Sequence, residues 1–312
     1  MRAILDMDTT QIEITNACPK ACGNCTRFCQ LVKKPYFMPL AEVKRAIDSM
    51  VGYPKMVGIM GGEPLLHPDF KKICEYLHKK IPPEQCGLWS IFPEGFEHHA
   101  DVICETFKHV FINDHSRADI FHQSPLVGIQ EIYEDKKEMW FIISHCWAQE
   151  SWSASINPRG AWFCEIAASM SMLYSEGQGW PVEREWWTAI PAMFWEQMQM
   201  FCPRCGFAAK TDLRCSQDPI DDVSPLNYEA LKKIVRHPER LKIYEPKETE
   251  KAQPEMAAYK DTVYRNRIAA RYGIRLYIND QHFWSPVKSS DKYISVPMRP
   301  MIEELAERFG AR

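Results

Sequence analysis

Strand patterns alternate with helical patterns over residues 11–132. Apolar and polar positions alternate in the first of these runs, and this pattern together with four later apolar runs predicts strands at 11–15, 55–60, 87–92, 109–113 and 126–132. Apolar residues spaced three and four apart predict helices at 40–50, 70–79 and 100–107. Strands and helices in this order predict parallel βα units and an α/β fold class.

The length of this region limits how many βα units it holds. A complete eight-unit barrel needs about 250 residues, or roughly 31 per unit. Residues 12–146 therefore have room for four or five units. We expect a partial, TIM-like (βα) barrel over residues 9–138, with its chemistry at the carboxyl ends of the strands.

The pattern changes near residue 139. Eight of the ten tryptophans lie between Trp140 and Trp195, where the βα rhythm stops. A hairpin is predicted at 152–165 around a Pro and Gly turn, followed by a helix at 166–174. We expect a small α+β lobe over 139–216. A mostly helical extension over 217–312 is then predicted to contain an acidic linker at 218–225, helices at 226–235 and 257–272, a strand at 274–278 and a terminal helix.

Composition restricts the class of protein. No apolar run approaches the 18 residues of a membrane span, and the first residues lack the order of a signal peptide, so a cytoplasmic protein without membrane contact is expected. A net charge of −3 gives no general attraction for nucleic acid. Twelve cysteines without a secretory signal indicate metal or redox chemistry rather than disulfides.

Three of these cysteines follow the first predicted strand in a C-x3-C-x2-C pattern. Cys18, Cys22 and Cys25 would give three thiolates to an iron–sulfur cluster, which leaves one of four irons open to a small molecule. A structural zinc site fits less well, because it wants four protein ligands and usually two C-x2-C pairs. The run Gly61-Gly62-Glu63-Pro64 ends the second strand, at the same edge of the predicted sheet.

These two motifs resemble the radical S-adenosylmethionine (SAM) superfamily. The resemblance implies that SAM chelates the open iron of a 4Fe-4S cluster and is cleaved by one electron to methionine and a 5′-deoxyadenosyl radical. It also implies contacts from the Gly-Gly-Glu-Pro motif to the SAM amino group, and from the end of the fourth strand to SAM or substrate. The family usually has an aromatic residue near the adenine where this chain has Asn24, so that contact must differ here. The residues expected to bind the cofactor are Gly61, Gly62, Glu63, Pro64, Asn24, Asn113 and Ser116, and those expected to act on the substrate are Asp114, His115 and Arg117.

A second cysteine set lies in the predicted α+β lobe: Cys146, Cys164, Cys202 and Cys205. It resembles the twitch lobe, the short form of the SPASM extension, most closely that of the aminocyclitol radical SAM dehydrogenases. The resemblance implies a fully ligated auxiliary 4Fe-4S cluster. Two alternatives stay open, a structural zinc site with four cysteines and a ligand set in which Cys215 replaces Cys146. Otherwise Cys215 is a spare thiol that can donate a hydrogen atom to a substrate radical.

Together these features predict an oxidoreductase. Its radical would abstract hydrogen from a small sugar, aminocyclitol or nucleotide-like substrate, and the auxiliary cluster would accept the remaining electron. A flavodoxin- or ferredoxin-type protein is the expected electron donor. The alternatives are a redox-neutral epimerase, dehydratase or decarboxylase, a ribosomal-peptide maturase, and a non-catalytic iron–sulfur or zinc scaffold.

Overall fold

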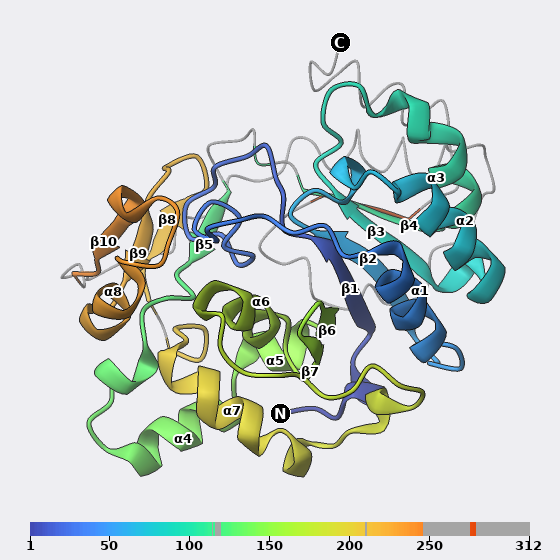
Figure 1. Cartoon of the computed structure of the whole chain (residues 1–312). Helices are drawn as coiled ribbons and strands as arrows, with labels where there is room; N and C mark the ends of the chain where they lie inside the picture. Colours follow the sequence, from blue (N-terminus) through green and yellow to red (C-terminus); the bar gives the residue numbers. More distant parts are fainter. Residues whose placement is uncertain (114, 116–119, 210, 246–274, 279–312) are drawn as a thin grey trace.

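A mostly parallel sheet organises the chain in the computed structural model (Figure 1), which describes residues 1–113, 115, 120–209, 211–245 and 275–278. Within these residues the sheet has seven strands in the order β11-β4-β3-β2-β1-β6-β7, and neighbours are parallel except in the β6–β7 hairpin. The strands are β1 (Thr9–Thr15), β2 (Met56–Gly61), β3 (Cys86–Ser90), β4 (His109–Ile112), β6 (Ala154–Asn157), β7 (Gly160–Trp162) and β11 (Arg275–Ile278).

Three helices alternate with the first four strands, as the sequence predicts. They are α1 (Leu40–Ser49), α2 (Phe70–Lys80) and α3 (Ala100–Thr106), and they lie together along one side of the sheet (Figure 1). Each helix buries residues three and four apart, for example Val43, Ala46 and Ile47 in α1. The partial (βα) barrel is confirmed.

Alternate residues of the strands face opposite sides of the sheet. Ile12 and Ile14 belong to the large apolar core, whereas Trp89, Phe111 and Met60 form a separate buried cluster. The rings of Trp89 and Phe111 stack with centroids 3.9 Å apart. A Cβ at Gly58 would lie 2.3 Å from the Trp89 ring, so a glycine in β2 makes room for this stack on the inner face of the barrel.

The predicted fifth strand at 126–132 is wrong. This segment holds a single β-bridge, at Leu126, and a 3₁₀ turn at Ile129–Glu131. Leu126, Val127 and Ile129 are buried by packing rather than in a strand, and a short apolar run alone does not distinguish the two. The outer neighbour of β4 is instead β11, which falls within the strand predicted at 274–278 and pairs with β4 in parallel.

The predicted hairpin is confirmed as β6 and β7, and the helix after it is α6 (Glu165–Tyr174). Because β6 pairs with β1 in parallel, the hairpin continues the barrel sheet. Beside it in Figure 1 lies α5 (Trp147–Ser151), and below it lie α4 (Lys136–Ser144) and α7 (Trp195–Phe201).

The predicted linker at 218–225 is also wrong. It contains the buried strand β9 (Asp221–Val223), which pairs with β10 (Leu241–Ile243), and is followed directly by α8 (Pro225–Leu231). A second small sheet joins β5 (Phe121–Gln123) to β8 (Leu213–Cys215). The helices predicted at 257–272 and at the end of the chain lie outside the described residues. No helix in the described part of the chain is long and apolar enough to cross a membrane.

Candidate functional site

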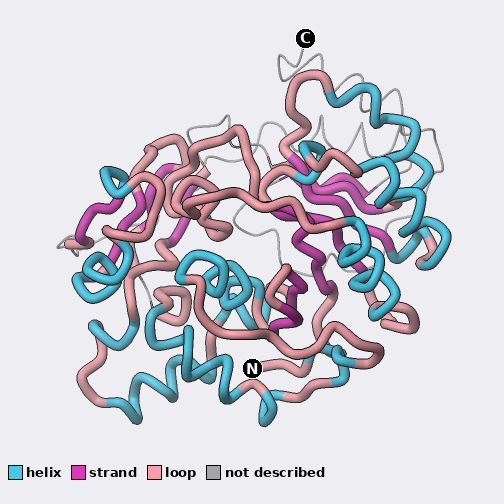
Figure 2. Tube along the Cα trace, viewed as in Figure 1, coloured by secondary structure: helices cyan, strands magenta, loops and turns pink. Residues whose placement is uncertain are grey.

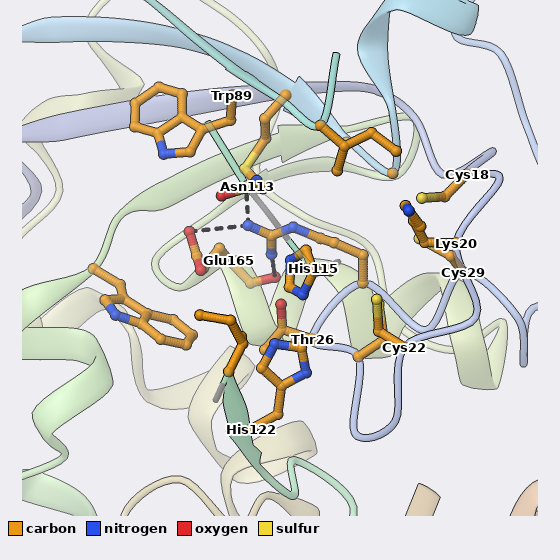
Figure 3. Close-up of a pocket in the computed structure, with 18 of the residues that line it drawn as sticks. Cys18, Lys20, Cys22, Thr26, Cys29, Trp89, Asn113, His115, His122 and Glu165 are labelled. Atoms are coloured by element: carbon orange, nitrogen blue, oxygen red, sulfur yellow. Dashed lines mark hydrogen bonds and ion pairs between the residues drawn. The ribbon is translucent and has the colours of Figure 1, made fainter. Parts of the chain in front are cut away.

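The first cysteine loop lies at the carboxyl ends of the parallel strands. The segment between β1 and α1 that carries it is drawn as loop in Figure 2. Cys18, Cys22 and Cys25 line a cavity of about 350 Å³ together with Gly61 and Gly62 at the end of β2. The structure thus brings together the two motifs that the sequence analysis singled out, and Figure 3 shows part of the cavity.

The two glycines allow the end of β2 to pack closely on the start of the cysteine loop. The Gly62 N–H donates to the Thr15 carbonyl at 2.8 Å, and the Glu63 N–H donates to the Ala17 carbonyl at 2.7 Å. A Cβ at Gly61 would lie 1.9 Å from the Thr15 oxygen, and one at Gly62 would lie 2.4 Å from the Ala17 oxygen. Side chains at these positions are therefore excluded by backbone, and backbone atoms face the cavity instead.

The Glu63 side chain joins the ends of β2 and β3. Its buried carboxylate accepts hydrogen bonds from the Leu65 N–H (3.0 Å), the Ser90 hydroxyl (2.7 Å) and the Ile91 N–H (2.8 Å). Burial raises the pKa of Glu63 to about 7. The described residues that line the cavity include neither Glu63 nor Pro64. In this arrangement Glu63 supports the strand ends, while Gly61 and Gly62 line the cavity.

Asn24 has a left-handed backbone (φ +50°), a conformation that asparagine tolerates better than most residues. Its side-chain amide donates to the Asp222 carboxylate at 3.0 Å, and the Asp222 N–H donates to its oxygen at 2.8 Å. Asn24 is buried and is not among the residues that line the cavity. A direct contact of Asn24 with SAM stays a prediction, since the observed contacts hold the loop instead.

Two histidines flank the cysteine loop. His115 follows β4 and His122 lies in β5, with ring centroids 5.0 Å apart (Figure 3). Burial lowers the pKa of His115 to about 3, and burial also lowers the pKa of His122. His122 donates from Nδ1 to the Gly23 carbonyl at 2.8 Å. Nδ1 of His115 is buried without a hydrogen-bond partner among the described residues. Burial therefore favours the neutral form of both rings, and a neutral ring keeps one nitrogen that can accept a proton.

The other residues predicted after β4 divide into two groups. Asn113 lines the cavity, as expected for a residue at the end of a barrel strand. Asp114, Ser116 and Arg117 lie outside the described residues.

A buried charged cluster that the sequence analysis missed lies beside the cavity. The Arg27 guanidinium is 3.0 Å from the Glu165 carboxylate and 3.5 Å from the Glu13 carboxylate, and it donates to the Gln11 side chain at 3.0 Å. Burial raises the pKa of Glu13, and the charge of Arg27 opposes this shift. Arg27, Glu165 and Gln11 all line the cavity. They place polar and charged groups close to the first cysteine loop.

Aromatic side chains form another wall of the same cavity. Trp147 and Trp152 pack edge to face at 5.1 Å, and Trp152 packs against Phe207 at 5.0 Å. The cavity therefore combines apolar surface with a few polar groups, as small-molecule sites do. Its aromatic lining residues are Trp89, Phe121, Trp147, Trp152 and Phe207.

The four cysteines of the second set also come together, around a small apolar cavity. Cys146 precedes α5, Cys164 precedes α6, and Cys202 and Cys205 lie at either end of a 3₁₀ turn after α7. Phe207 lines both this cavity and the first one. The two cysteine sites are therefore neighbours that share a wall.

The four thiols of this second set are close enough to influence one another. Burial and the neighbouring Cys146 raise the pKa of Cys164 to about 12, and burial together with the other thiols raises the pKa values of Cys202 and Cys205. Buried thiolates that repel each other need positive charge, which metal supplies. Within the described residues no three or more His, Cys, Asp or Glu side chains are grouped closely enough to hold a single metal ion.

The remaining cysteines separate by environment. Cys215 lies in β8 opposite Phe121, and the described residues that line the two cavities do not include it. Cys146, unlike Cys215, lines the second cavity together with Cys164, Cys202 and Cys205. Cys29 is buried beside the first cavity, within hydrogen-bonding reach of the Cys18 and Cys25 thiols.

Comparisons with known proteins agree with the first motif. Residues 12–113 match the family model of the Radical SAM superfamily. The solved structure of BtrN in complex with AdoMet and 2-DOIA is 12% identical, with a TM-score of 0.43, and the match covers 64% of this chain and 92% of that one. Selenomethionine BtrN in an open conformation is 14% identical, with a TM-score of 0.39 and coverage of 68% and 91%. No curated protein sequence matches the chain.

Proposed function

Because residues 12–113 match the family model of the Radical SAM superfamily, we propose that this protein is a radical SAM enzyme that oxidises a small polar substrate by two electrons. The substrate is a sugar, an aminocyclitol or a nucleotide-like molecule. One hydrogen atom leaves a substrate carbon that carries a hydroxyl or amino group. One proton and one electron then leave, and the carbon becomes doubly bonded to its oxygen or nitrogen.

The cysteines and the glycine turn fit the groups that this chemistry needs. When bound, a 4Fe-4S cluster at Cys18, Cys22 and Cys25 together with SAM supplies the 5′-deoxyadenosyl radical, and a second cluster at the second cysteine set supplies an electron acceptor. Gly61 and Gly62 present backbone atoms to SAM, since they carry no side chains toward the cavity.

The chain's own side chains bind and orient the substrate. The Gln11 amide donates to or accepts from hydroxyl and amino groups, and the Glu165 carboxylate accepts from them. Arg27 fixes Glu165 in place through their ion pair and donates to Gln11. Trp147 and Trp152 cover the apolar face of the substrate and exclude water, which protects a radical from side reactions.

His115 takes the proton that leaves the substrate. Its ring is neutral, and Nδ1 is buried beside the cavity without a partner among the described residues. A positioned neutral imidazole of this kind is a common general base. The low pKa of His115 makes it a weak base. The hydroxyl or amino proton of the substrate becomes more acidic once the neighbouring carbon is a radical, which helps the transfer.

One observation carries the choice of oxidation over a redox-neutral reaction. The second cysteine set shares Phe207 with the substrate cavity, and Cys164 is followed directly by Glu165, which lines that cavity. An electron acceptor held by the second cysteine set lies next to a substrate in the first cavity, whereas Cys215 lines neither cavity. A flavodoxin- or ferredoxin-type protein completes the reaction as electron donor.

The fate of the substrate electron tests this proposal. A panel of aminocyclitols, sugars and nucleotide sugars is incubated anaerobically with enzyme, SAM and reductant. For the accepted substrate we expect one SAM consumed per oxidised product. Cys202→Ala and Cys205→Ala should abolish the product while some 5′-deoxyadenosine still forms, and Cys215→Ala should keep the product. A deuteron from deuterated solvent in the product carbon, lost in Cys215→Ala, would instead identify a redox-neutral enzyme.

A further inference from the structure

A segment late in the sequence holds the first cysteine loop through its backbone. The Gly23 N–H donates to the Ser216 carbonyl at 3.0 Å, and the Asn24 N–H donates to the Ile220 carbonyl at 3.3 Å. A Cβ at Gly23 would lie 2.1 Å from the Asp218 oxygen, so this approach requires a glycine between Cys22 and Cys25. The loop is therefore shaped to fit the residues that precede and form β9.

An ion pair strengthens this attachment. The Arg240 guanidinium is 2.9 Å from the Asp221 carboxylate, and it donates to the carbonyls of Cys22 (2.9 Å) and Ala21 (3.3 Å). Burial raises the pKa of Asp221, which Arg240 and the N–H groups of Asn24 and Cys25 oppose. The pair thus provides a donor for the loop carbonyls and an acceptor for the loop N–H groups.

The same segment holds the second cysteine loop at its other end. The buried Asn227 amide donates to the Arg204 carbonyl at 2.9 Å and to the Leu126 carbonyl at 2.8 Å, and its oxygen accepts from the Tyr174 hydroxyl at 2.8 Å. Arg204 lies between Cys202 and Cys205. Asn227 is therefore fixed on three sides, one of which is the backbone of the auxiliary cysteine turn.

The two attachment points are close in sequence and rigidly connected. Asn227 follows Asp222, the partner of Asn24, by five residues, so their Cα atoms are within about 18 Å of each other. Between them, the Ser224 hydroxyl accepts from the Gly128 N–H at 3.1 Å, and the Leu226 N–H donates to the Glu131 carboxylate at 2.9 Å. Little freedom remains along the segment.

We propose that residues 222–227 form a bracket that fixes the two cysteine loops relative to each other. Asn24 with Asp222 is one attachment, and Asn227 with Arg204 is the other. The inference rests on the proposed function for its purpose: an electron passes from a substrate in the first cavity to an acceptor at the second cysteine set at a useful rate only if the separation of the two sites is constant and short. Asn24, Asp222 and Asn227 are positioning residues, since they touch the loops and not the substrate.

A bracket predicts that a change at one end is felt at the other, which ordinary local packing does not. We therefore compare Asn227→Leu with Asn24→Gly, which removes the amide while glycine still accepts the left-handed backbone. Leu226→Ala, an exposed position on the same helix, is the matched control. Amide hydrogen exchange is measured in the reconstituted protein and in the cluster-free protein.

We expect Asn227→Leu to increase exchange at residues 21–25 at least tenfold, and Asn24→Gly to do the same at 202–206, with no change in Leu226→Ala. In the reconstituted protein, the distribution of dipolar couplings between the two reduced clusters should become broader in both variants, because their separation varies more. Faster exchange confined to the substituted end, in the variant or variants that fold, would overturn the bracket. If the wild-type protein held only one cluster, the electron acceptor of the proposed function would be refuted. The exchange data would still test whether residues 222–227 connect the two cysteine loops.

Discussion

Glu63 shows how a single buried residue makes stability depend on pH. Its pKa is raised from 4.5 to about 7 by burial. Between pH 4.5 and about 7, the folded protein therefore keeps a proton on Glu63 that the unfolded chain has lost. This contribution is fully present below pH 4.5 and is lost as pH rises through about 7, and it amounts to something on the order of 3 kcal/mol.

The variant Glu63→Gln tests this residue directly. It cannot titrate, so the difference in unfolding free energy between wild type and variant should become smaller as pH rises from 5 to 8. The variant should also be less stable by an amount that does not depend on pH. The Gln amide nitrogen is a donor and cannot accept the hydrogen bonds that the Glu63 carboxylate accepts. Urea unfolding under anaerobic conditions measures both effects. A difference that stays the same over this pH range would show that Glu63 is ionised throughout.

At the same scale, the sequence revealed the motif residues but not their partners. Cys18, Cys22 and Cys25 are close in sequence, and their spacing carries the signal. The partners of Arg27 and Asn24 that matter most, Glu165 and Asp222, lie 138 and 198 positions away, and no local pattern connects them. Such pairs form only when the chain has folded, so a single sequence does not reveal them.

At the scale of elements, the docking of β2 on the cysteine loop depends on Gly61. In Gly61→Ala the new Cβ would meet the Thr15 carbonyl at 1.9 Å, so backbone must move and the loop must shift. Gly95→Ala is the matched control. Gly95, like Gly61, has a positive φ (+83°), but no atom lies within 4 Å of the Cβ that alanine would add there. The control should lose about 1–2 kcal/mol of stability.

We expect Gly61→Ala to lose more stability than this control and also the iron bound at Cys18, Cys22 and Cys25. Chemical unfolding and iron analysis of both variants provide the comparison. Equal stability and equal iron content in the two would mean that the close approach of Gly61 to Thr15 is not needed.

The alternating helices and strands were predictable because each repeats its pattern over several residues. Four of the five strands and all three helices predicted for the barrel agree with the structure to within a few residues. The acidic stretch around Asp221 and Asp222 was misread as a solvated linker. Both carboxylates are buried against arginines, Arg240 and Arg214, and a charge pattern does not reveal such distant partners.

At the scale of the whole molecule, the two cysteine sets predict the iron content. Anaerobically reconstituted protein should hold about eight irons per chain, or two 4Fe-4S clusters. The triple variant of Cys18, Cys22 and Cys25 to alanine should keep about four, because the second set is separate from the first cavity. About four irons with one zinc in the unaltered protein would remove the auxiliary cluster from the reaction.

Cleavage of SAM without substrate tests the central claim most directly. The first cysteine loop and the Gly61–Gly62 turn line one cavity, and the proposed function places there both SAM and a cluster with an open iron. With dithionite as reductant, the wild-type protein should release 5′-deoxyadenosine slowly, and the triple alanine variant of Cys18, Cys22 and Cys25 should release none. Wild-type protein that holds its full iron content and still fails to form 5′-deoxyadenosine would contradict the account.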